Sequence, residues 1–370
     1  MSWLKAKMLR YVLCFHEFHD PFEEDYRLCD IERVKKLHAN VFHGCMQNFG
    51  GNPPPELLLE LIHKWRKDLD QLRSADMKLI FLLDSKSFRR KLFREGGLDP
   101  EKYLGVGLDG KPMGGTHKHH GDWPGSDYVE SCYANPYWLD FMKKEVEIYA
   151  REGIDGVFYD AGPFLVNPIC YCRYCQDGFR EYTKKVFGKE HSLPRKVDYA
   201  DRVYRACARW RWETYKDFFT EVHDHVKKIN PEFVHTPNLL SYIPGYVYLF
   251  HHDFADFLHL EEDNGPPHTN IYAYKIGLAA GKGKPVVVVC GVAPTPEQYK
   301  IAIAEGYVYG GINNPCLNHC CEDIMKAIED SFKFFEKYEE YYFEAEQVCN
   351  VAILYSWKSR LAYELSNSTG

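Results

Sequence analysis

The chain has 370 residues, and 45% of them are hydrophobic, which is enough for the core of a large enzyme domain. Its 46 basic and 53 acidic residues give a net charge of −7, so the basic face of a nucleic-acid-binding protein is not expected. No apolar run approaches the roughly 18 residues that cross a bilayer, and the N-terminal MSWLKAKMLRYVLCF lacks the pattern of a signal peptide. Thirteen cysteines in such a chain predict a reducing, cytoplasmic location, where clustered cysteines bind metal more often than they form disulfides.

Short apolar runs recur along the chain, and most of them end on a polar residue. They are too short for helices and rich in β-branched and aromatic residues, as in the buried strands of a parallel sheet. Eight strands are predicted, at residues 9–15, 41–46, 78–83, 154–160, 232–236, 257–260, 285–289 and 307–312.

Helical patterns lie between most of these strands. The predicted helices cover residues 30–39 (with Asp30 as N-cap), 53–75, 135–152, 176–187, 198–229, 270–280, 297–306 and 322–346. Eight alternating units predict an α/β fold of the (β/α)8 TIM-barrel type, and no G-x-G-x-x-G follows the first strand to indicate a doubly wound sheet. Residues 85–134, rich in Gly, His and charge, form a long loop of the kind that carries function. A ninth apolar run at 351–355 suggests a barrel over 1–347 and the start of a second domain at 348–370.

Polar residues follow the predicted strands, and barrel enzymes place their chemistry at the C-terminal ends of strands. The candidate site residues are His16, Glu17, Asn48, Asp84, Asp160, His235, Asn238, Glu261, Glu262, Asp263 and Asn313. Two acidic positions stand out among them, namely Asp160 after the fourth strand and the Glu261-Glu262-Asp263 run after the sixth.

Hydrolysis of a glycosidic bond needs two carboxyl groups, one ionised and one protonated. We expect strands four and six to oppose each other and to supply this pair, with Asp160 as nucleophile and Glu261 or Glu262 as general acid/base. Neighbouring strand residues face opposite sides, so the pattern alone does not choose between the two glutamates. The alternative role for such acids is to cap a helix or to pair with Lys or Arg.

The long loop contains THKHHGDW, with three histidines (His117, His119 and His120) and Trp123. The histidine spacing resembles a metal cluster, but no acids accompany it at matching positions, so we favour non-metal roles. Trp123 is a candidate stacking face for a sugar ring, or else a packing anchor.

Three cysteines form a C-x-C-x2-C cluster after the fourth strand: Cys170, Cys172 and Cys175. A structural zinc ion takes four tetrahedral ligands, and Cys132 is the expected fourth. The rival ligands are Cys14, Cys290, Cys316 and the Cys320-Cys321 pair, and the alternative is a set of reduced, buried thiols. Four thiolates leave no open position for water, so such a zinc would be structural.

The order Cys132, NPYW, a helix, a strand ending in an acid, CYCRYC and an FREY helix resembles the family 42 glycoside hydrolases, which are β-galactosidase-type barrels. The resemblance covers about fifty residues closely. It implies zinc on Cys132, Cys170, Cys172 and Cys175, and it implies that VAILYS begins a flavodoxin-like oligomerisation domain, hence a homo-oligomer.

The catalytic pattern departs from that family, which carries Asn-Glu after strand four and Glu after strand seven. Here these strands end in Tyr159-Asp160 and Cys290-Gly291. The motif GIDGVFYD instead looks like the α-glycosidase barrels, including α-galactosidases and α-L-fucosidases, whose nucleophile is an Asp at the end of strand four. In the α-galactosidase group the acid/base follows strand six, which points to Glu261, Glu262 or Asp263.

We therefore predict a cytoplasmic, retaining glycoside hydrolase that removes an α-linked sugar from a small glycoside or oligosaccharide. The alternatives are a catalytically silent sugar-binding or scaffold barrel, a β-galactosidase-type enzyme, and a metal-dependent hydrolase that uses the loop histidines.

Overall fold

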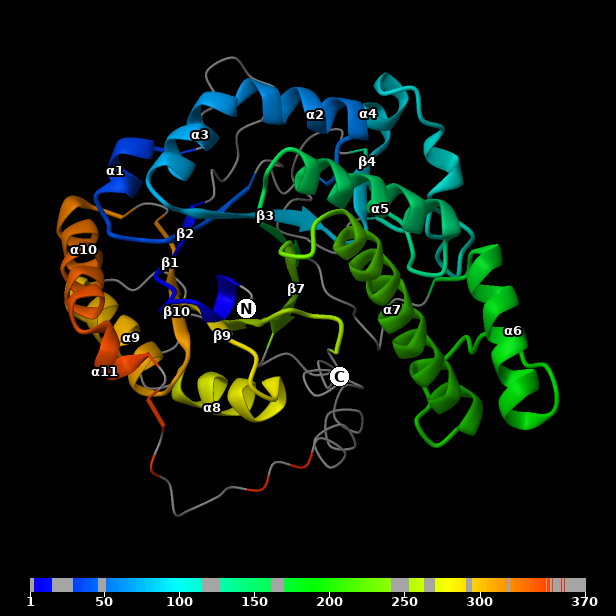
Figure 1. Ribbon diagram of the computed structural model, residues 1–370. Helices are drawn as coiled ribbons and strands as arrows, with labels where there is room; N and C mark the ends of the chain where they lie inside the picture. The colour runs from blue at the N-terminus through cyan, green and yellow to red at the C-terminus, as the bar shows by residue number, and fades with distance from the viewer. Residues whose placement is uncertain are drawn as a thin grey trace.

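Eight parallel strands form the centre of the protein (Figure 1). The computed structural model describes residues 3–14, 29–45, 51–114, 127–160, 170–240, 253–262, 270–290, 295–317 and 320–343, with positions 345, 346, 348, 354 and 356. The strands are β1 (Tyr11–Cys14), β2 (Val41–Gly44), β3 (Lys78–Asp84), β6 (Gly156–Asp160), β7 (Val234–Leu240), β8 (Leu258–Glu262), β9 (Val286–Cys290) and β10 (Ile312–Pro315).

The sheet closes on itself. Its strands are paired in chain order, and a parallel bridge joins Leu13 of β1 to Cys316, directly after β10. The N–H of Leu317 also donates to the carbonyl oxygen of Leu13 over 2.8 Å. The predicted (β/α)8 barrel is therefore confirmed.

Helices surround the barrel (Figure 1). They are α1 (Ile31–Lys35), α2 (Pro55–Lys64), α3 (Arg66–Ser74), α4 (Arg90–Glu95), α5 (Pro136–Arg151), α6 (Arg173–Phe187), α7 (Arg202–Ile229), α8 (Asn270–Gly281), α9 (Pro296–Val308), α10 (Glu322–Lys337) and α11 (Glu339–Tyr342), with short 3-10 turns η1 (Trp3–Lys5) and η2 (Pro100–Lys102). Asp30 caps α1 as predicted, because its side chain accepts from the N–H of Arg33. None of the described helices is long and apolar enough to span a membrane.

Several predicted elements differ from the structure, among them the fifth strand, which is Val234–Leu240 instead of 232–236, and the first helix, which ends at Lys35. The helix expected at 53–75 is two helices that meet at Trp65, and the last long helix is interrupted at Tyr338. The eighth strand begins at Ile312, since α9 continues to Val308 and the chain then turns at Gly310, which has φ 81°. The long loop contains a two-stranded hairpin of β4 (Ser87–Arg89) and β5 (Tyr128–Glu130).

Alternation along the strands divides the core into two layers. One buried cluster fills the barrel and includes Tyr11, Ile80, Phe158, Phe257 and Val287. Residues one position away, such as Val157 and Leu258, belong to the larger cluster between strands and helices. This alternation decides which strand-end side chains face into the barrel.

A third cluster lies outside the barrel, where α6 packs on the outer side of α7 (Figure 1). Its buried members are Met113, Cys132, Cys170, Cys172, Cys175, Phe179, Leu193, Tyr204, Ala206, Cys207 and Trp210. We call this part of the molecule the cysteine lobe. The predicted ninth strand at 351–355 lies, apart from position 354, outside the described residues, so the second domain and its boundary remain a prediction.

Candidate functional site

Two carboxylates and one amide meet at the C-terminal ends of three neighbouring strands. The side-chain nitrogen of Asn238 lies 3.0 Å from Oδ1 of Asp160 and 2.6 Å from Oε2 of Glu261. Asn238 is 5% exposed, whereas both acids are half-buried. One amide group thus donates to both carboxylates and holds them together at the barrel end.

The pleat of each strand accounts for this arrangement. Phe158 lies two residues before Asp160 and is in the cluster that fills the barrel. His259, two residues before Glu261, packs against Phe158 with ring centroids 4.4 Å apart. Since alternate residues share a face, Asp160 and Glu261 continue the inward-facing rows of β6 and β8.

The two acids are not opposed across the barrel, as the sequence had suggested. The strands β6 and β8 flank the single strand β7, which supplies Asn238 between them. Oδ1 of Asp160 and Oε2 of Glu261 accept from the same nitrogen, over 3.0 and 2.6 Å, so the distance between these two oxygens cannot exceed the sum of the two bond lengths. This span is shorter than the roughly 6.5–9.5 Å between the carboxyl groups of inverting glycosidases, and it is compatible with the roughly 5–5.5 Å of retaining ones.

Asp84 pairs with Asp160 in the register of β3 and β6, so it lies at the same rim. Its Oδ1 accepts from the N–H groups of Lys86 and Ser87, over 3.1 and 2.9 Å, and its Oδ2 accepts from the hydroxyl of Tyr128 over 2.7 Å. These bonds fasten the β4–β5 hairpin to the end of β3. The observed role of Asp84 is thus to shape the loop beside Asp160.

Two predicted site residues lie away from this rim. His235 is fully buried near the start of β7, with Nε2 2.7 Å from the carbonyl oxygen of Phe254 and Nδ1 3.1 Å from the hydroxyl of Tyr159. Asn313 donates to the hydroxyl of Tyr274, on α8, over 3.3 Å. Both residues alternate with inward-facing neighbours and so face the surrounding helices.

The barrel interior beneath the carboxylates contains two fully buried histidines, which the sequence analysis missed. The rings of His43 and His259 lie 5.5 Å apart, and Nε2 of His259 lies 3.2 Å from the amide nitrogen of Asn314. Burial lowers the pKa of His259 to about 3 and that of His43 well below its usual 6.5. Both side chains are therefore neutral at ordinary pH. The sequence did contain a signal for their position. His259 is two residues before Glu261 and His43 two before Cys45, and residues two apart on a strand share a face.

Several candidates lie outside the described residues: His16, Glu17, Asn48, Trp123, Asp263 and the loop histidines His117, His119 and His120. The backbone of Glu262 is described as the last residue of β8, but its side chain is not.

The four predicted cysteines do come together. One Sγ from each of Cys132, Cys170, Cys172 and Cys175 lies within 4.8 Å of the others. The Sγ of Cys132 is 3.4 Å from that of Cys172 and 3.7 Å from that of Cys175. Four thiolates around a zinc ion at about 2.3 Å would be about 3.8 Å apart, so the group fits a tetrahedral metal.

The surroundings of the four sulfurs favour a thiolate at two of them, Cys170 and Cys172. The backbone N–H groups of Val106 and Cys172 point at the Sγ of Cys170, at 3.4 and 3.5 Å. Hydrogen bonds, with Cys132 first among them, hold the pKa of Cys170 and of Cys172 below its ordinary value, whereas hydrogen bonds within the group and burial raise the pKa of Cys132 and of Cys175 well above it. These four residues could therefore hold a structural metal ion.

The rival cysteines with described side chains lie elsewhere. Cys14 hydrogen-bonds to Cys29, and the Sγ of Cys320 lies 3.2 Å from the carbonyl oxygen of Cys316. The side chain of Cys290 is outside the described residues.

A second group of metal-ligand type comprises His223, His235 and Asp256. Its donors are already used, because both ring nitrogens of His235 have partners and the ammonium group of Lys227 lies 2.8 Å from the carboxylate of Asp256. The positive charge beside Asp256 is thus that of Lys227 and not of a metal ion. The group is an ion-pair network near the start of β7.

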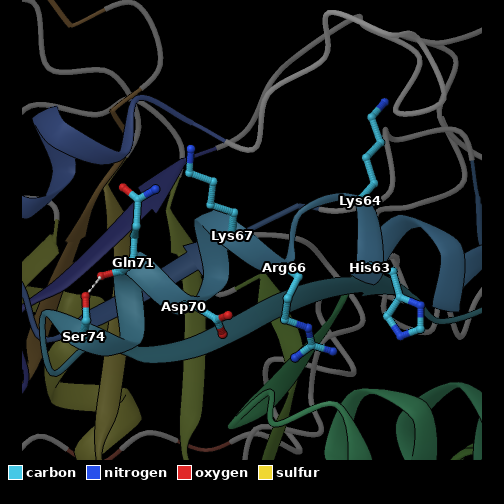
Figure 2. Close-up of a pocket in the computed structure, with 7 residues that line it drawn as sticks. All are labelled: His63, Lys64, Arg66, Lys67, Asp70, Gln71 and Ser74. Carbon is cyan, nitrogen blue, oxygen red and sulfur yellow. Dashed lines mark hydrogen bonds between the residues drawn. The ribbon is translucent and has the colours of Figure 1, made fainter.

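The surface also has a wide, open hollow of about 650 Å³ along α2 and α3 (Figure 2). Figure 2 shows Lys64, Lys67 and Gln71 pointing to one side of α2 and α3 and His63, Arg66 and Asp70 pointing to the other. Arg66 is paired with Glu152 at the end of α5. Because its side chains do not converge, this hollow has no features of a binding site.

No protein-family model and no curated protein sequence match the chain. Among solved structures, the chain is similar to a β-galactosidase from Bacillus circulans sp. alkalophilus, with a TM-score of 0.70 and 14% identity over 99% of this chain and 61% of that one. It is also similar to a catalytic mutant of a GH42 β-galactosidase from G. stearothermophilus (TM-score 0.68, 12% identity, 97% and 61%). A GH36 α-galactosidase from Geobacillus stearothermophilus has a TM-score of 0.52 at 12% identity, over 93% and 43% of the two chains.

At these identities the similarity shows a shared barrel fold and nothing finer. The chain spans about three fifths of the length of the two β-galactosidases.

Proposed function

We propose that the protein is a glycoside hydrolase that cleaves an α-linked sugar from a small glycoside with retention of configuration. Asp160 would attack the anomeric carbon, while Glu261 would protonate the departing oxygen. Glu261 would then take a proton from water as the water displaces Asp160 from the sugar. Each step moves one proton and replaces one bond to the anomeric carbon, so the two carboxyl groups suffice.

The observation that carries this proposal is the double hydrogen bond from Asn238 to Asp160 and Glu261. Retention requires two close carboxyl groups in opposite protonation states. In this mechanism Asp160 is ionised and accepts one bond from Asn238. Glu261 is protonated, and because its Oε2 accepts the second bond, its proton would be carried by Oε1.

Similarity to β-galactosidase and α-galactosidase barrels supports a carbohydrate substrate. The α configuration of the glycosidic linkage is proposed from the residues that end the fourth strand. Strand four here ends in Tyr159-Asp160, whereas the family 42 pattern has Asn-Glu, and the α-glycosidase barrels have the Asp. The candidates Asn48, Trp123 and Asp263, which lie outside the described residues, would then be sugar-binding residues. Asp84 would instead support the neighbouring loop through its bonds to Tyr128 and Ser87.

Zinc is the metal we propose for Cys132, Cys170, Cys172 and Cys175, because a four-cysteine set with these sulfur spacings suits it. Zinc there would supply only structural cross-linking, since no ligand position remains for water. We also propose that the protein is cytoplasmic and forms a homo-oligomer.

A panel of aryl α- and β-glycosides, assayed with measurement of zinc content on the same sample, tests the function. We expect turnover of an α-glycoside, release of the α-anomer first, and no turnover by Asp160→Asn at unchanged zinc content and melting temperature. Full activity of Asp160→Asn would refute the mechanism. Sugar binding without hydrolysis of any glycoside would favour the scaffold alternative, and turnover of β-galactosides alone would favour the β-galactosidase alternative.

A further inference from the structure

One buried serine connects three parts of the protein at the end of β3. Ser85 is fully buried, and its N–H donates to the carbonyl oxygen of Asp160 over 3.1 Å. Its own carbonyl oxygen accepts from Nε1 of Trp138, on α5, over 2.9 Å. Its hydroxyl shares a 2.7 Å hydrogen bond with the hydroxyl of Tyr133. Ser85 therefore ties the end of β6 to α5 and to Tyr133.

Tyr133 directly follows Cys132, one of the four clustered cysteines. Cys132 is buried in the cysteine lobe, but the ring of Tyr133 packs against the main core, edge-on to Tyr215 and Phe218 at 5.3 and 5.1 Å. Two adjacent residues thus belong to two different cores. Because one planar peptide holds the Cα atoms of Cys132 and Tyr133 about 3.80 Å apart, a displacement of Cys132 bears directly on Tyr133.

Further bonds join the segment before Cys132 to the segment after Asp84. The N–H of Ser131 donates to the carbonyl oxygen of Lys86 over 2.7 Å, and the ammonium group of Lys86 lies 2.9 Å from the carboxylate of Glu130 in a buried ion pair. The chain before Cys132 is thereby fastened to the chain after Asp84. Only Tyr133 and Ser85 then separate Cys132 from the backbone of Asp160.

We propose that the metal-loaded cysteine centre holds Asp160 in place through Tyr133 and Ser85, and that these two residues are positioning residues for the site. A metal ion would fix Cys132 relative to Cys170, Cys172 and Cys175, and hence would fix Tyr133 and its bond to Ser85. The bond from Ser85 to Asp160 continues the β3–β6 ladder at its last rung, where it has the least support from the rest of the sheet.

Amide hydrogen exchange of the full chain tests this directly, because the Ser85 N–H is the group that binds Asp160. We expect removal of the metal by a chelator to speed exchange at Ser85 by about tenfold or more, while the amides of β9 keep their protection. Unchanged exchange at Ser85 would overturn the proposal. An equal rise in β9 would also overturn it, since the metal would then only maintain the whole fold.

Tyr133→Phe removes the hydroxyl and keeps the ring packing. We expect this variant to bind one zinc per chain and yet to exchange Ser85 faster, by about tenfold, with the metal bound. Tyr137→Phe is the matched control, because Tyr137 is 42% exposed and its ring packs against Tyr174 instead. Exchange at Ser85 that is equal in both variants would contradict the role of Tyr133.

The activity measurement rests on the proposed function, whereas the exchange measurement does not. In the hydrolase, Tyr133→Phe should lower kcat by about tenfold with little change in KM, because Asp160 acts on the bound substrate. If Tyr133→Phe speeds exchange at Ser85 in a protein that hydrolyses no glycoside, the positioning role stands and the hydrolase assignment fails. If wild-type activity is present and Tyr133→Phe changes neither kcat nor exchange, the positioning role fails alone.

Discussion

The amide nitrogen of Asn238 donates to Oδ1 of Asp160 over 3.0 Å, which joins the ends of β7 and β6. A second bond of 2.6 Å from the same nitrogen reaches Glu261. Hydrogen bonds to a carboxylate stabilise its ionised form and lower its pKa. Asn238 thus contacts both proposed catalytic groups at once, and its replacement should slow the reaction.

We expect Asn238→Leu, which keeps the approximate size but removes the donor, to lower kcat/KM by about 10²-fold. The loss should appear mainly in kcat, because the two carboxyl groups lose the donor that holds them together. Steady-state rates of the variant and the wild type test this. Thr236→Val is the control, since Thr236 lies on the same strand and bonds instead to the carbonyl oxygen of Phe257. An unchanged kcat in Asn238→Leu would refute the shared-donor role.

Glu261 and Glu262 should differ in their effect on catalysis. The inward row of β8 contains His259 and Glu261, and the bond from Asn238 reaches Glu261. We expect Glu261→Gln to lower kcat/KM by about 10²–10⁴-fold for a poor leaving group, and by less for an activated aryl glycoside, which needs no proton. Glu262→Gln should cause the smaller loss on the same two substrates. The reverse order would assign the acid to Glu262.

The cysteine lobe should depend on its metal. We expect Cys175→Ser to reduce bound zinc from about one ion per chain to none and to lower the melting temperature, because a structural zinc contributes directly to folding. Cys207→Ser is the matched control: Cys207 is also buried in the lobe, but it lies outside the group of four sulfurs. Zinc content measured by atomic emission should be unchanged in that variant. Equal loss of zinc in both variants would contradict the four-cysteine site.

The sequence predicted the features that depend on local pattern. Buried strands are apolar runs, so the barrel followed from their number, and the spacing of Cys170, Cys172 and Cys175 indicated the cysteine cluster. Cys132 was also named, and the structure brings it to the other three cysteines. The role of Asp160 stays a prediction.

Features that depend on strand phase or on distant partners were not predicted. The fifth strand was expected to end at Thr236, which put His235 at the rim, but β7 continues to Leu240 and leaves His235 near its start. Which of Glu261 and Glu262 reaches Asn238 depends on the phase of β8, and the structure shows that Glu261 does. Asp84 is satisfied by Tyr128, 44 residues later, and no local pattern reveals such a contact.

Three buried histidines should make the stability of the protein depend on pH. Burial lowers the pKa of His235 and of His259 to about 3, and burial together with the neighbouring His259 lowers that of His43 well below 6.5. All three are neutral in the folded protein but gain a proton in the unfolded chain below about pH 6.5. Their contribution is therefore fully present above that pH and is lost as the pH falls toward the folded pKa values, by up to about 1.4 kcal/mol per pH unit for each group.

One buried acid opposes this trend. Glu145 of α5 is fully buried, and burial raises its pKa well above 4.5, so it keeps a proton that the unfolded chain loses. Between about pH 5 and 6 it therefore favours folding as the pH falls, with a slope of equal size and opposite sign. Three histidines against one glutamate give these four groups together a net slope of at most about 3 kcal/mol per pH unit, and their joint contribution to stability is greater at pH 6 than at pH 5.

Urea unfolding at half-unit steps from pH 5 to 7 measures this slope. His259→Gln should reduce the slope by about 1.4 kcal/mol per pH unit, because one of the three neutral histidines is removed. His63→Gln is the control, since the His63 side chain is 59% exposed on α2. If His63→Gln and His259→Gln changed the slope equally, or if stability were flat across this range, the histidines in the barrel wall would have to accept protons in the folded state.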